Sequence, residues 1–454
     1  MNSRYRRVWL LLVTATLSAC GGGGGGGGAQ EVTPTLLSIA LSPLAVSLPV
    51  GGTAQLKVTG TYSDGTVQTL AAGETFQSSD SGTATVSGSG LVSVAAGATV
   101  GATATITATD TASGERTPAA DSTVVTVVPT GPGPPTASSV SAAQSTASSN
   151  ANCTAIEPFY WEVGDDTATL ASGSVGTDTA GAPVTSSTNV SIASASKWIY
   201  GMYVVQMRGA AAKLTPQDIN FLHFTSGYTY MGTDTTSATC TMPASGPDSI
   251  NACLTLTNSS GERFDARNPA TIGVFDYDSG HEENHAGQFQ PEINALDTSV
   301  LGTAIATELG LNNVIDLRYS QPLLAGGVFD NGGDYAAILR SVLNGQLKML
   351  DALGTNPVCA WSNDPTTCNA AYSPVFTLQW HYSIAHWVED DSNTGDGAFS
   401  SPGAFGFYPW IEANKLYYGV ISRYTPTGSG LQNGLASQSC GQEIRAAWDS
   451  GHPQ

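Results

Sequence analysis

Residues 129–150 divide the chain into two parts that we expect to fold around separate cores. The stretch reads PTGPGPPTASSVSAAQSTASSN, rich in Pro and Gly first and in Ser and Ala afterwards. Such a composition is typical of a linker, stiffer where Pro dominates. Apart from Trp9, every Trp follows this stretch, as does every Cys except Cys20. The compositions of the two parts therefore predict two different kinds of domain.

The part before the linker, residues 35–128, is predicted to be all β. It contains short runs in which apolar and polar residues alternate, such as residues 54–59 (AQLKVT) and 102–108 (ATATITA). Many short strands at regular spacing, separated by Gly, Ser and Asp turns, are typical of a β-sandwich. The segments LxSIxxSP, LPVGGTAQL, GTYSDGT, SGLVSVAAG and TATITAT resemble, in this order, the bacterial immunoglobulin-like group 2 domain. That resemblance implies a spacer or adhesive module without chemistry of its own.

Residues 1–19 are predicted to be a lipoprotein signal peptide. Arginines at positions 4, 6 and 7 precede a short apolar run, residues 8–17, whereas a membrane span needs about 20 such residues. Leu17-Ser18-Ala19-Cys20 then resembles the bacterial lipobox, in which the Cys thiol is acylated and becomes the new N-terminus. The alternative is an ordinary signal peptide that is cut at a small-residue site.

A lipid on Cys20 would make the membrane a partner of this protein and place it in the cell envelope. Gly21 follows the Cys in place of Asp, which by analogy with lipoproteins favours the outer membrane. Residues 21–28 are all Gly, and Gly-rich segments behave as flexible coil. We therefore expect residues 20–34 to tether the lipid to a folded protein that faces the oxidising periplasm or the medium.

The charge balance excludes one large class of partners. The chain of 454 residues has 16 Lys and Arg against 36 Asp and Glu, which gives a net charge of −20. Binding to nucleic acid needs a basic surface that neutralises phosphates, so we expect no nucleic-acid partner. Only 11% of the residues are charged and many are small and polar, which suits a secreted β-rich protein.

The part after the linker, residues 151–454, contains six Cys, and an even number in an oxidising compartment indicates disulfides. Six Cys can pair in fifteen ways. Proximity in the sequence favours Cys240–Cys253 and Cys359–Cys368, and elimination then joins Cys153 to Cys440. Metal binding by these cysteines is a weaker alternative, because the sequence contains no CxxC motif.

Ser194 and Lys197 form the pattern S-x-x-K at the start of an apolar stretch that is predicted to be helical to about residue 210. Residues three apart lie on one face of a helix, one turn from each other. A Lys that loses solvent there can take the proton of the Ser hydroxyl, which makes the Ser a nucleophile. The alternative is a Ser that caps the helix and a Lys that is solvated, since this chain is rich in Ser.

Several segments resemble, in order, the serine β-lactamase and penicillin-binding-protein superfamily. IASASKWIYGMYVV and LTPQDINFLHFTSGY correspond to the family's IASxSKxxTA and ITxxxLLxHTSG, and residues 325–345 correspond to GGLxSTAxDxAxxxxxLLNG. The resemblance covers about residues 155–425. It implies an α/β (α+β) domain, in which helices and a helical subdomain flank an antiparallel sheet, after the Ig-like sandwich. It also implies an acyl-enzyme mechanism that needs neither a metal nor an organic cofactor.

The second motif of that family, Tyr-x-Asn, is altered in this chain. Tyr277 matches the Tyr, and the resemblance implies that it relays protons beside Ser194 and Lys197. Ser279 replaces the Asn, so it would be a changed contact to the substrate. The alternative for Tyr277 is an aromatic residue of the core.

The third motif, Lys/His-Thr/Ser-Gly, is altered as well. Its best match is SSPG, in which Ser401 replaces the cation and Gly403 lets an edge strand approach the substrate closely. Ser401 and Gly403 would thus bind substrate, and the amides of Ala404 and Ser194 would form the oxyanion hole. In β-lactamases and peptidases of the family the cation holds a substrate carboxylate. Its loss therefore argues for an ester or amide without that carboxylate.

Residues 281–285 (HEENH) match the zinc-protease pattern H-E-x-x-H, which offers a competing interpretation. On a helix, His281 and His285 would bind zinc, with Glu282 as the base and Glu308 as a possible third ligand. However, no apolar helical run precedes His281, and the nearby Gly and Asp residues indicate a strand and a turn. We therefore expect no metal, and we expect His281 to line a substrate cleft near Tyr277.

An aromatic cluster at residues 380–387 and 407–410 allows two interpretations, because pockets and cores use the same residue types. It could line an apolar substrate pocket or pack inside the sheet.

The predicted function is that of a cell-envelope serine hydrolase that acts through an acyl-enzyme on a small or oligomeric ester or amide. One alternative is a catalytically inactive surface protein for binding or adhesion, which the two altered motifs permit. A second alternative is a zinc hydrolase that uses residues 281–285.

Overall fold

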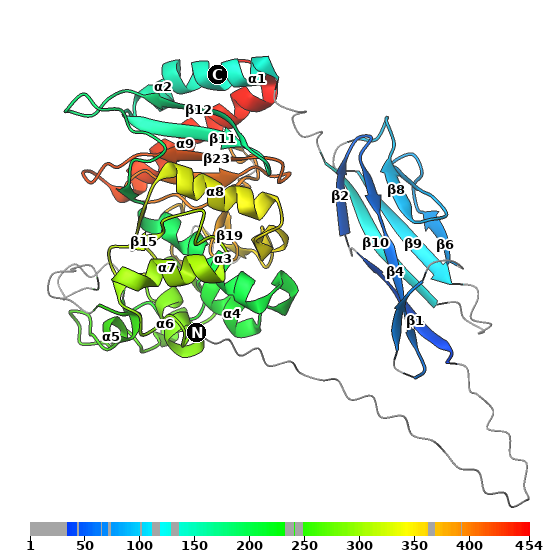
Figure 1. Ribbon diagram of the computed structural model, residues 1–454. Coiled ribbons are helices and arrows are strands. Elements are labelled where there is room, and N and C mark those ends of the chain that lie inside the picture. Colours follow the sequence, from blue (N-terminus) through cyan, green and yellow to red (C-terminus); the bar gives the residue numbers. More distant parts are fainter. Residues whose placement is uncertain are drawn as a thin grey trace, which may run out of the picture. The chain divides into compact units, whose positions relative to one another are not determined.

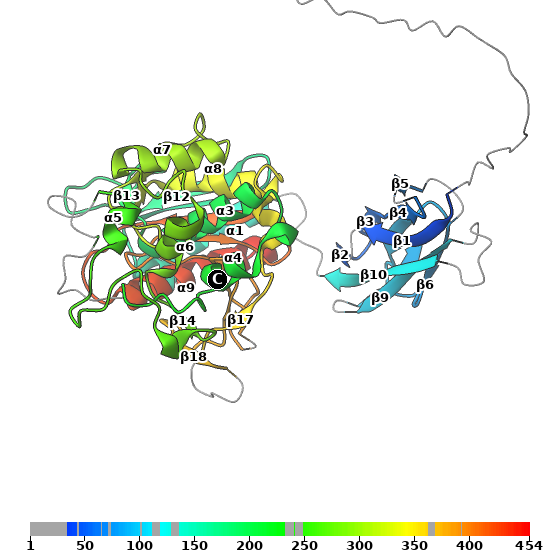
Figure 2. The same ribbon diagram turned by 90° about the horizontal axis from the view of Figure 1, so that it is seen from below.

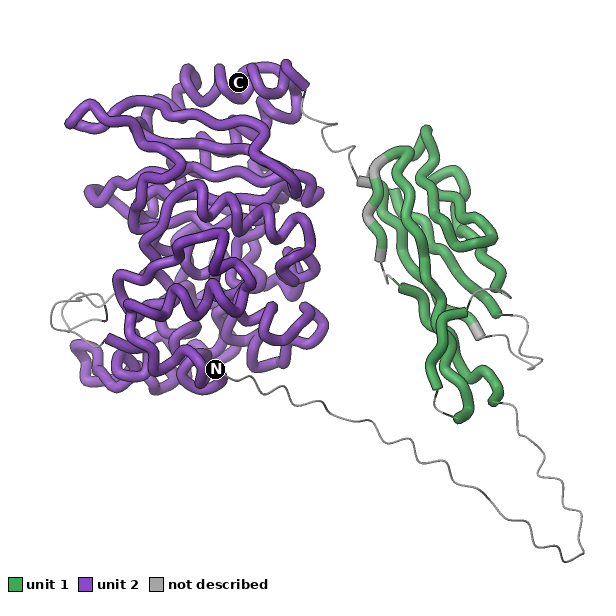
Figure 3. Tube along the Cα trace, in the orientation of Figure 1, with its two compact units in different colours: residues 1–128 green, residues 129–454 purple. Residues whose placement is uncertain are grey.

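The computed structural model describes residues 34–42, 45–64, 66–70, 74–99, 102–110, 119–128, 136–231, 240, 248–361, 368–391 and 393–454. The chain divides into two compact units, residues 1–128 and 129–454 (Figure 3). The predicted signal peptide, Cys20 and the glycine tether lie outside the described residues, as does the Pro/Gly half of the predicted linker. None of the helices in the described ranges is both long enough and apolar enough to cross a bilayer.

The described part of the first unit consists of strands and turns, which confirms the all-β prediction. The strands pair in the orders β1-β4-β5, β2-β10-β9-β6 and β3-β8-β7. Along β9, Ala104, Ile106 and Ala108 are buried and the Thr residues between them are more exposed, so alternate side chains face one core. The bounds are β1 (Leu36–Ser42), β2 (Ala45–Pro49), β3 (Thr53–Gln55), β4 (Lys57–Tyr62), β5 (Val67–Thr69), β6 (Glu74–Ser78), β7 (Ala84–Val86), β8 (Leu91–Val94), β9 (Thr103–Asp110) and β10 (Ala119–Val128).

The second half of the predicted linker belongs to the second unit, and here the prediction is wrong. Helix α1 (Ala137–Ser149) begins after Thr136, whose side chain accepts a hydrogen bond from the backbone N–H of Ser139. Ala143 and Ala147 are buried, and α1 packs against the C-terminal helix α9 (Gly430–Ser450). Ala is the best helix former, and its small side chain lets two helices approach closely. The Ser/Ala composition that suggested a spacer therefore also suits a closely packed helix.

An antiparallel sheet forms the centre of the second unit (Figure 1). In the described residues it has eight strands in the order β12-β11-β23-β22-β21-β20-β19-β17. The first strand of the unit thus lies beside the last, because β11 pairs with β23. The bounds are β11 (Phe159–Gly164), β12 (Thr169–Val175), β17 (Val358–Cys359), β19 (His381–Tyr382), β20 (Trp387–Val388), β21 (Phe399–Ser400), β22 (Tyr408–Ile411) and β23 (Tyr418–Ser422).

Helices cover both faces of this sheet, as expected (Figure 2). On β23, Val420 packs into the core beside α8 (Gly332–Leu343), and its neighbour Ile421 packs into the core beside α9. Successive strand residues point to opposite faces, so the two helices lie on opposite sides. The predicted fold class is confirmed: an Ig-like β domain, followed by an α/β domain with an antiparallel sheet between helices.

The remaining elements surround the α8 side of the sheet or link its strands. They are α2 (Ala151–Thr154), β13 (Val190–Ser191), η1 (Ala193–Ala195), α3 (Ser196–Arg208), η2 (Ala211–Lys213), α4 (Pro216–Leu222), α5 (Ile250–Leu254), η3 (Pro269–Thr271), β14 (Phe275–Asp276), α6 (His281–Phe289), α7 (Thr298–Glu308), β15 (Arg318–Tyr319), β16 (Val328–Asp330), η4 (Lys348–Ala352) and β18 (Ala370–Tyr372).

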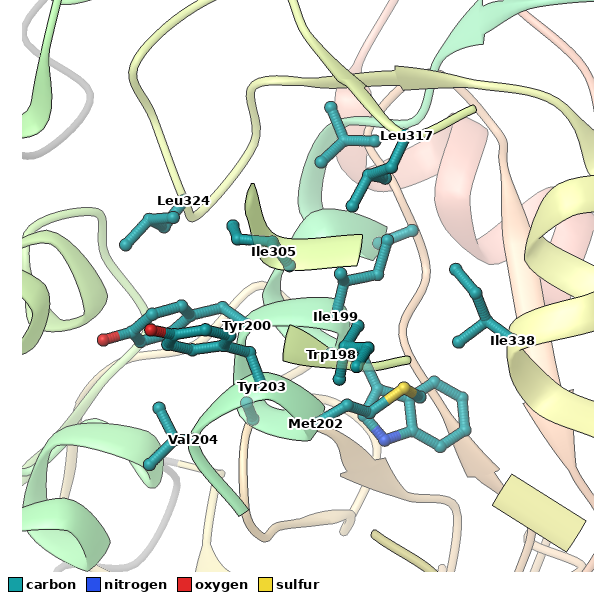
Figure 4. Close-up of a cluster of buried hydrophobic side chains, with 14 of the residues drawn as sticks. Trp198, Ile199, Tyr200, Met202, Tyr203, Val204, Ile305, Leu317, Leu324 and Ile338 are labelled. Carbon is teal, nitrogen blue, oxygen red and sulfur yellow. The ribbon is translucent and has the colours of Figure 1, made fainter. Parts of the chain in front are cut away.

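Helix α3 is the centre of the largest core, and its sequence explains its position. Every residue from Ser196 to Val205 is buried, and the helix ends at Gly209, whose φ of 79° closes it in the left-handed region. Figure 4 shows Trp198, Ile199 and Tyr203 of this helix among side chains of other elements. A helix that is apolar all round must be buried, so the residues at its start are held in a rigid frame.

The three predicted disulfides are all present: Cys153–Cys440, Cys240–Cys253 and Cys359–Cys368. The first joins α2 to α9 across 287 residues, with the two Cα atoms 4.7 Å apart. It therefore connects the beginning and the end of the second unit.

Replacing Cys153 and Cys440 together by Ser is expected to lower the free energy of unfolding by about 2–5 kcal/mol. The bond closes a loop of 287 residues, so its loss frees a large part of the unfolded chain. Urea unfolding followed by Trp fluorescence measures the effect. The matched control removes Cys240–Cys253, which spans only 13 residues and should cost less. A greater loss from the short loop than from the long one would contradict this account.

Candidate active site

Ser194 is presented by a strained turn at the start of the central helix. The chain leaves β13, passes through η1 and enters α3. Ala193, directly before Ser194, has a φ of 47°, which is uncommon for a residue other than Gly and costs free energy. Such strain persists only where the surrounding structure imposes it. Ser194 lines a cavity of about 430 Å³, so this turn exposes the Ser to a space that a ligand can fill.

The neighbouring Ser196 has a structural role that separates it from Ser194. It is fully buried, and its Oγ donates to the carbonyl oxygen of Ala193 at 2.6 Å. The same Oγ accepts a hydrogen bond from the N–H of Val328 at 3.2 Å. Ser196 therefore fixes the turn, while Ser194 keeps its hydroxyl open to the cavity.

Lys197 is placed where the S-x-x-K pattern predicts. Its Nζ donates to the Oγ of Ser194 at 3.2 Å and to the carbonyl oxygen of Ala325 at 2.7 Å. Only 4% of the side chain is exposed, so these two contacts replace bulk water around the amine. An amine at this distance from a hydroxyl can take its proton. The alternative of a solvated Lys is wrong, because the helix that begins here is buried.

Glu283 holds the loop that holds Lys197, a role that the sequence interpretation missed. One carboxylate oxygen accepts from the N–H of Ala325 at 2.8 Å, and the other accepts from the N–H of Gly280 at 2.8 Å. The second bond is the reciprocal contact of a Glu at the third position of a helix. A Glu three residues after Gly280 was the available signal, although its link to Ala325 depends on the tertiary fold.

Tyr277 reaches the same cavity from the loop that follows β14. Its ring packs against Trp387, with ring centres 5.0 Å apart, and the Nζ of Lys197 lies 5.0 Å from the centre of the Tyr277 ring. Ser279 also lines the cavity, as expected. The structure thus brings Ser194, Lys197 and Tyr277 together from two separate segments, and the proton-relay role of Tyr277 stays a prediction.

The third motif lies beside Ser194, but its residues divide differently from the prediction. Gly403 and Ala404 line the cavity, and a Cβ on Gly403 would collide with the carbonyl oxygen of Ile192. In the described residues, the N–H of Ala404 has no hydrogen-bond acceptor, so it can serve an oxyanion. A backbone N–H in the first turn of a helix lacks an intrahelical acceptor, which leaves the amide of Ser194 available as well.

Ser401 does not line the cavity, and its prediction as a substrate contact is wrong. Its side chain is 2% exposed, and its Oγ donates to the carbonyl oxygen of Ser194 at 3.0 Å. The contact joins segments 207 residues apart. Ser401 therefore positions the turn that carries Ser194.

His281 also lies outside the cavity, contrary to the prediction. It is fully buried and stacks on Phe224, with ring centres 4.9 Å apart. Its two ring nitrogens form hydrogen bonds with Ser226 Oγ and with the carbonyl oxygen of Asp276. Burial lowers the pKa of His281 to about 3, so the ring stays neutral. His281 supports the Tyr277 loop from behind.

Residues 281–285 do lie on a helix, α6, so the predicted strand and turn are wrong for this segment. Gly280, with a φ of 115°, begins the helix without an apolar run before it. The nitrogens of His285 are nevertheless occupied, by the hydroxyl of Tyr200 at 2.6 Å and by Asp218 at 2.8 Å. A zinc ion needs free imidazole nitrogens, and neither His offers one.

The other proposed zinc residues are also unsuited to that role. Burial raises the pKa of Glu282, whose carboxyl oxygens have no hydrogen-bond partner among the described residues. Glu308 ends α7 and lines a separate groove. In the part of the chain that the structure describes, no three His, Cys, Asp or Glu side chains are arranged to hold a metal ion.

The aromatic cluster divides between the two roles considered for it. Trp387 lines the cavity, whereas Tyr408 and Trp410 are fully buried in the core beside α9. The remaining wall includes residues that sequence patterns did not single out. They are Asp278, Tyr372, Pro374, Val375, Pro402, Ser429, Gly430, Leu431, Gly434 and Leu435. Asp278 lies inside the altered second motif, but no local signal connects the start of α9 to Ser194.

Comparisons with known proteins agree with the architecture of the first unit. Residues 36–120 match the family model of the bacterial Ig-like domain (group 2). No curated protein matches the sequence.

Among solved structures, the chain is similar to three that illustrate the range of matches. A β-lactamase from Mycobacterium bovis has 12% identity and a TM-score of 0.36, covering 65% of this chain and 96% of its own. Simvastatin synthase from Aspergillus terreus has 13% identity and a TM-score of 0.41, with coverages of 67% and 100%. EstCE1, described as a hydrolase with promiscuous acyltransferase activity, has 12% identity and a TM-score of 0.45, with coverages of 67% and 98%. At such identities these likenesses assign no activity to this chain.

Proposed function

We propose that the second unit is a serine hydrolase that cleaves an ester or amide through an acyl-enzyme. The observation that carries this proposal is the contact of 3.2 Å between Lys197 Nζ and Ser194 Oγ at the wall of a cavity. A nucleophile within hydrogen-bond reach of a base, held by a third group, is the usual arrangement for covalent catalysis. Here the third group is the carbonyl of Ala325.

The reaction follows from these positions. Ser194 Oγ attacks the substrate carbonyl carbon while its proton passes to Lys197 Nζ. The N–H groups of Ser194 and Ala404 hold the negative oxygen that forms. The bond to the leaving alcohol or amine then breaks, and that group takes the proton from Lys197 through Tyr277. Water attacks the acyl-enzyme in the same way, which releases the acid and restores Ser194.

The cavity wall supports a substrate without a carboxylate next to the scissile bond. Of the described residues that line it, Lys197 is the one basic side chain, and its amine already binds Ser194 and Ala325. Ser401, at the place of the family's cation, is buried behind the cavity. The apolar side chains of Val375, Leu431 and Leu435 instead suit an uncharged acyl group.

We also propose that the protein acts in the cell envelope, anchored by a lipid on Cys20, with the Ig-like domain as a spacer. The match of residues 36–120 to a bacterial Ig-like domain supports an envelope location, as do the three disulfides. Neither a metal nor an organic cofactor has a part in this proposal.

The proposal is tested by incubating residues 30–454 with a fluorophosphonate and measuring the intact mass. One adduct per chain is expected, on the peptide that contains Ser194. Because Ser196 is committed to backbone contacts, the Ser196→Ala variant, if folded, should still be labelled. Absence of any adduct, in a chain whose circular dichroism shows it to be folded, would favour the inactive binding protein instead.

A further inference from the structure

The cavity contains one acidic side chain among its described lining residues, Asp278, which sits between Tyr277 and Ser279. Its Oδ1 accepts a hydrogen bond from the N–H of Ser279 at 3.0 Å. Within the described part of the chain, its other carboxylate oxygen has no hydrogen-bond partner, and it is not sealed from solvent. A carboxylate oxygen in a cavity is an acceptor that a ligand can satisfy.

Aromatic rings surround this carboxylate. Tyr277 and Trp387 line the cavity with their ring centres 5.0 Å apart. Tyr372 comes from β18, and its carbonyl oxygen accepts from the N–H of Tyr277 at 3.0 Å, which brings its ring to the same wall. Tyr372 is 49% exposed, so it forms part of the mouth. Ring faces attract cations, and a carboxylate beside them adds an opposite charge.

The charges around Asp278 leave this attraction uncompensated. Lys197 is the neighbouring cation, and its amine is bound to Ser194 and Ala325. Asp276 and Glu283 add further negative charge near Asp278. The cavity therefore lacks a protein cation that is free to pair with this carboxylate.

We infer that Asp278, with the rings of Tyr277, Tyr372 and Trp387, forms a subsite for an ammonium or trialkylammonium group. This subsite would direct the hydrolase toward cationic esters or amides. The inference rests on the proposed function only for the reaction, because binding of the cation needs no catalysis. It also gives a physical reason for excluding carboxylate substrates, which Asp278 would repel.

The binding should depend on pH in a stated direction. Burial, with a contribution from Asp276, raises the pKa of Asp278 to about 7. Burial also raises the pKa of Asp276 to about 6, and burial and Asp278 raise that of Tyr372. Below about pH 7 the Asp278 carboxyl is protonated and attracts a cation weakly. Affinity is therefore present above that pH and is lost as the pH falls through it.

Calorimetry with an isosteric pair of ligands tests the inference. Choline and 3,3-dimethylbutan-1-ol have the same shape, but only choline is charged. Choline should bind the chain at least about tenfold more tightly than the alcohol at about pH 8, and its affinity should fall about tenfold by about pH 6. The affinity of the alcohol should not change over this range.

Two variants complete the test. Asp278→Asn should remove the preference for choline and its pH dependence while the alcohol still binds, which shows that the cavity is intact. Asp166→Asn, at an exposed site away from the cavity, is the matched control and should behave as the parent chain. Equal binding of choline and the alcohol to the parent chain, or an unchanged preference in Asp278→Asn, would overturn the inference. Fluorophosphonate labelling of Ser194 without choline binding refutes the subsite alone, and choline binding without labelling refutes the hydrolase alone.

Discussion

Replacing Ser194 by Ala is expected to abolish fluorophosphonate labelling and to lower the hydrolysis of any ester substrate by at least about 10³-fold. The reason is that Ser194 Oγ is the hydroxyl that both lines the cavity and accepts a hydrogen bond from Lys197. Without it, no acyl-enzyme can form, and only the oxyanion donors and the cavity remain. Intact mass and initial rates on an activated ester measure the two effects.

The matched control for this variant is Ser187→Ala. Ser187 is exposed and lies in the loop before β13, so its removal should leave labelling and rate unchanged. Because Ser194 is partly exposed and its side chain forms no backbone bond, Ser194→Ala should also unfold at the temperature of the parent. A folded Ser194→Ala chain that is still labelled would mean that another residue is the nucleophile.

Replacing Lys197 by Met is expected to lower the rate of acylation by about 10²–10⁴-fold, the usual contribution of a positioned general base. Met keeps the length of the side chain and suits a buried site, so the fold should tolerate it. What is lost is the amine that contacts Ser194 Oγ at 3.2 Å and is oriented by Ala325. The rate of fluorophosphonate labelling, followed by mass over time, reports acylation directly.

Two further variants make this test specific. Lys197→Arg keeps a positive charge, but a guanidinium cannot take up a proton, so it should not restore the rate. Lys213→Met, at an exposed position in η2, is the matched control and should acylate as the parent chain does. If Lys197→Met retained more than about a tenth of the parent's rate, Lys197 would not be the base.

Local patterns predicted the parts of this molecule that depend on neighbours in the chain. The alternating runs before residue 128 predicted strands, and Thr215, Pro216 and Asp218 predicted the start of α4, where the capping box is present. The S-x-x-K spacing predicted the meeting of Ser194 and Lys197, because one turn of helix fixes their separation. Two of the disulfides followed from proximity for the same reason.

The same kind of reasoning failed where a local pattern has two outcomes. The Ser/Ala run at residues 137–149 suits both a spacer and a packed helix, and contact with α9, almost 300 residues later, decides for the helix. Residues 281–285 lack an apolar run before them, yet the positive φ of Gly280 begins a helix there. In both cases the deciding partner lies outside the pattern.

By itself, the sequence determined the two-part organisation, the strands of the first unit, the central helix and the spacing of Ser194 and Lys197. Only the tertiary structure decided which side chains enter the cavity. Ser401 and His281 turn away from it, while Asp278, Tyr372 and the start of α9 form its wall. The physical reason is one of range: hydrogen bonds along the backbone and helical periodicity act over a few residues. The direction of a side chain, in contrast, is set by packing between segments that can be 200 residues apart, as Ser194 and Ser401 are.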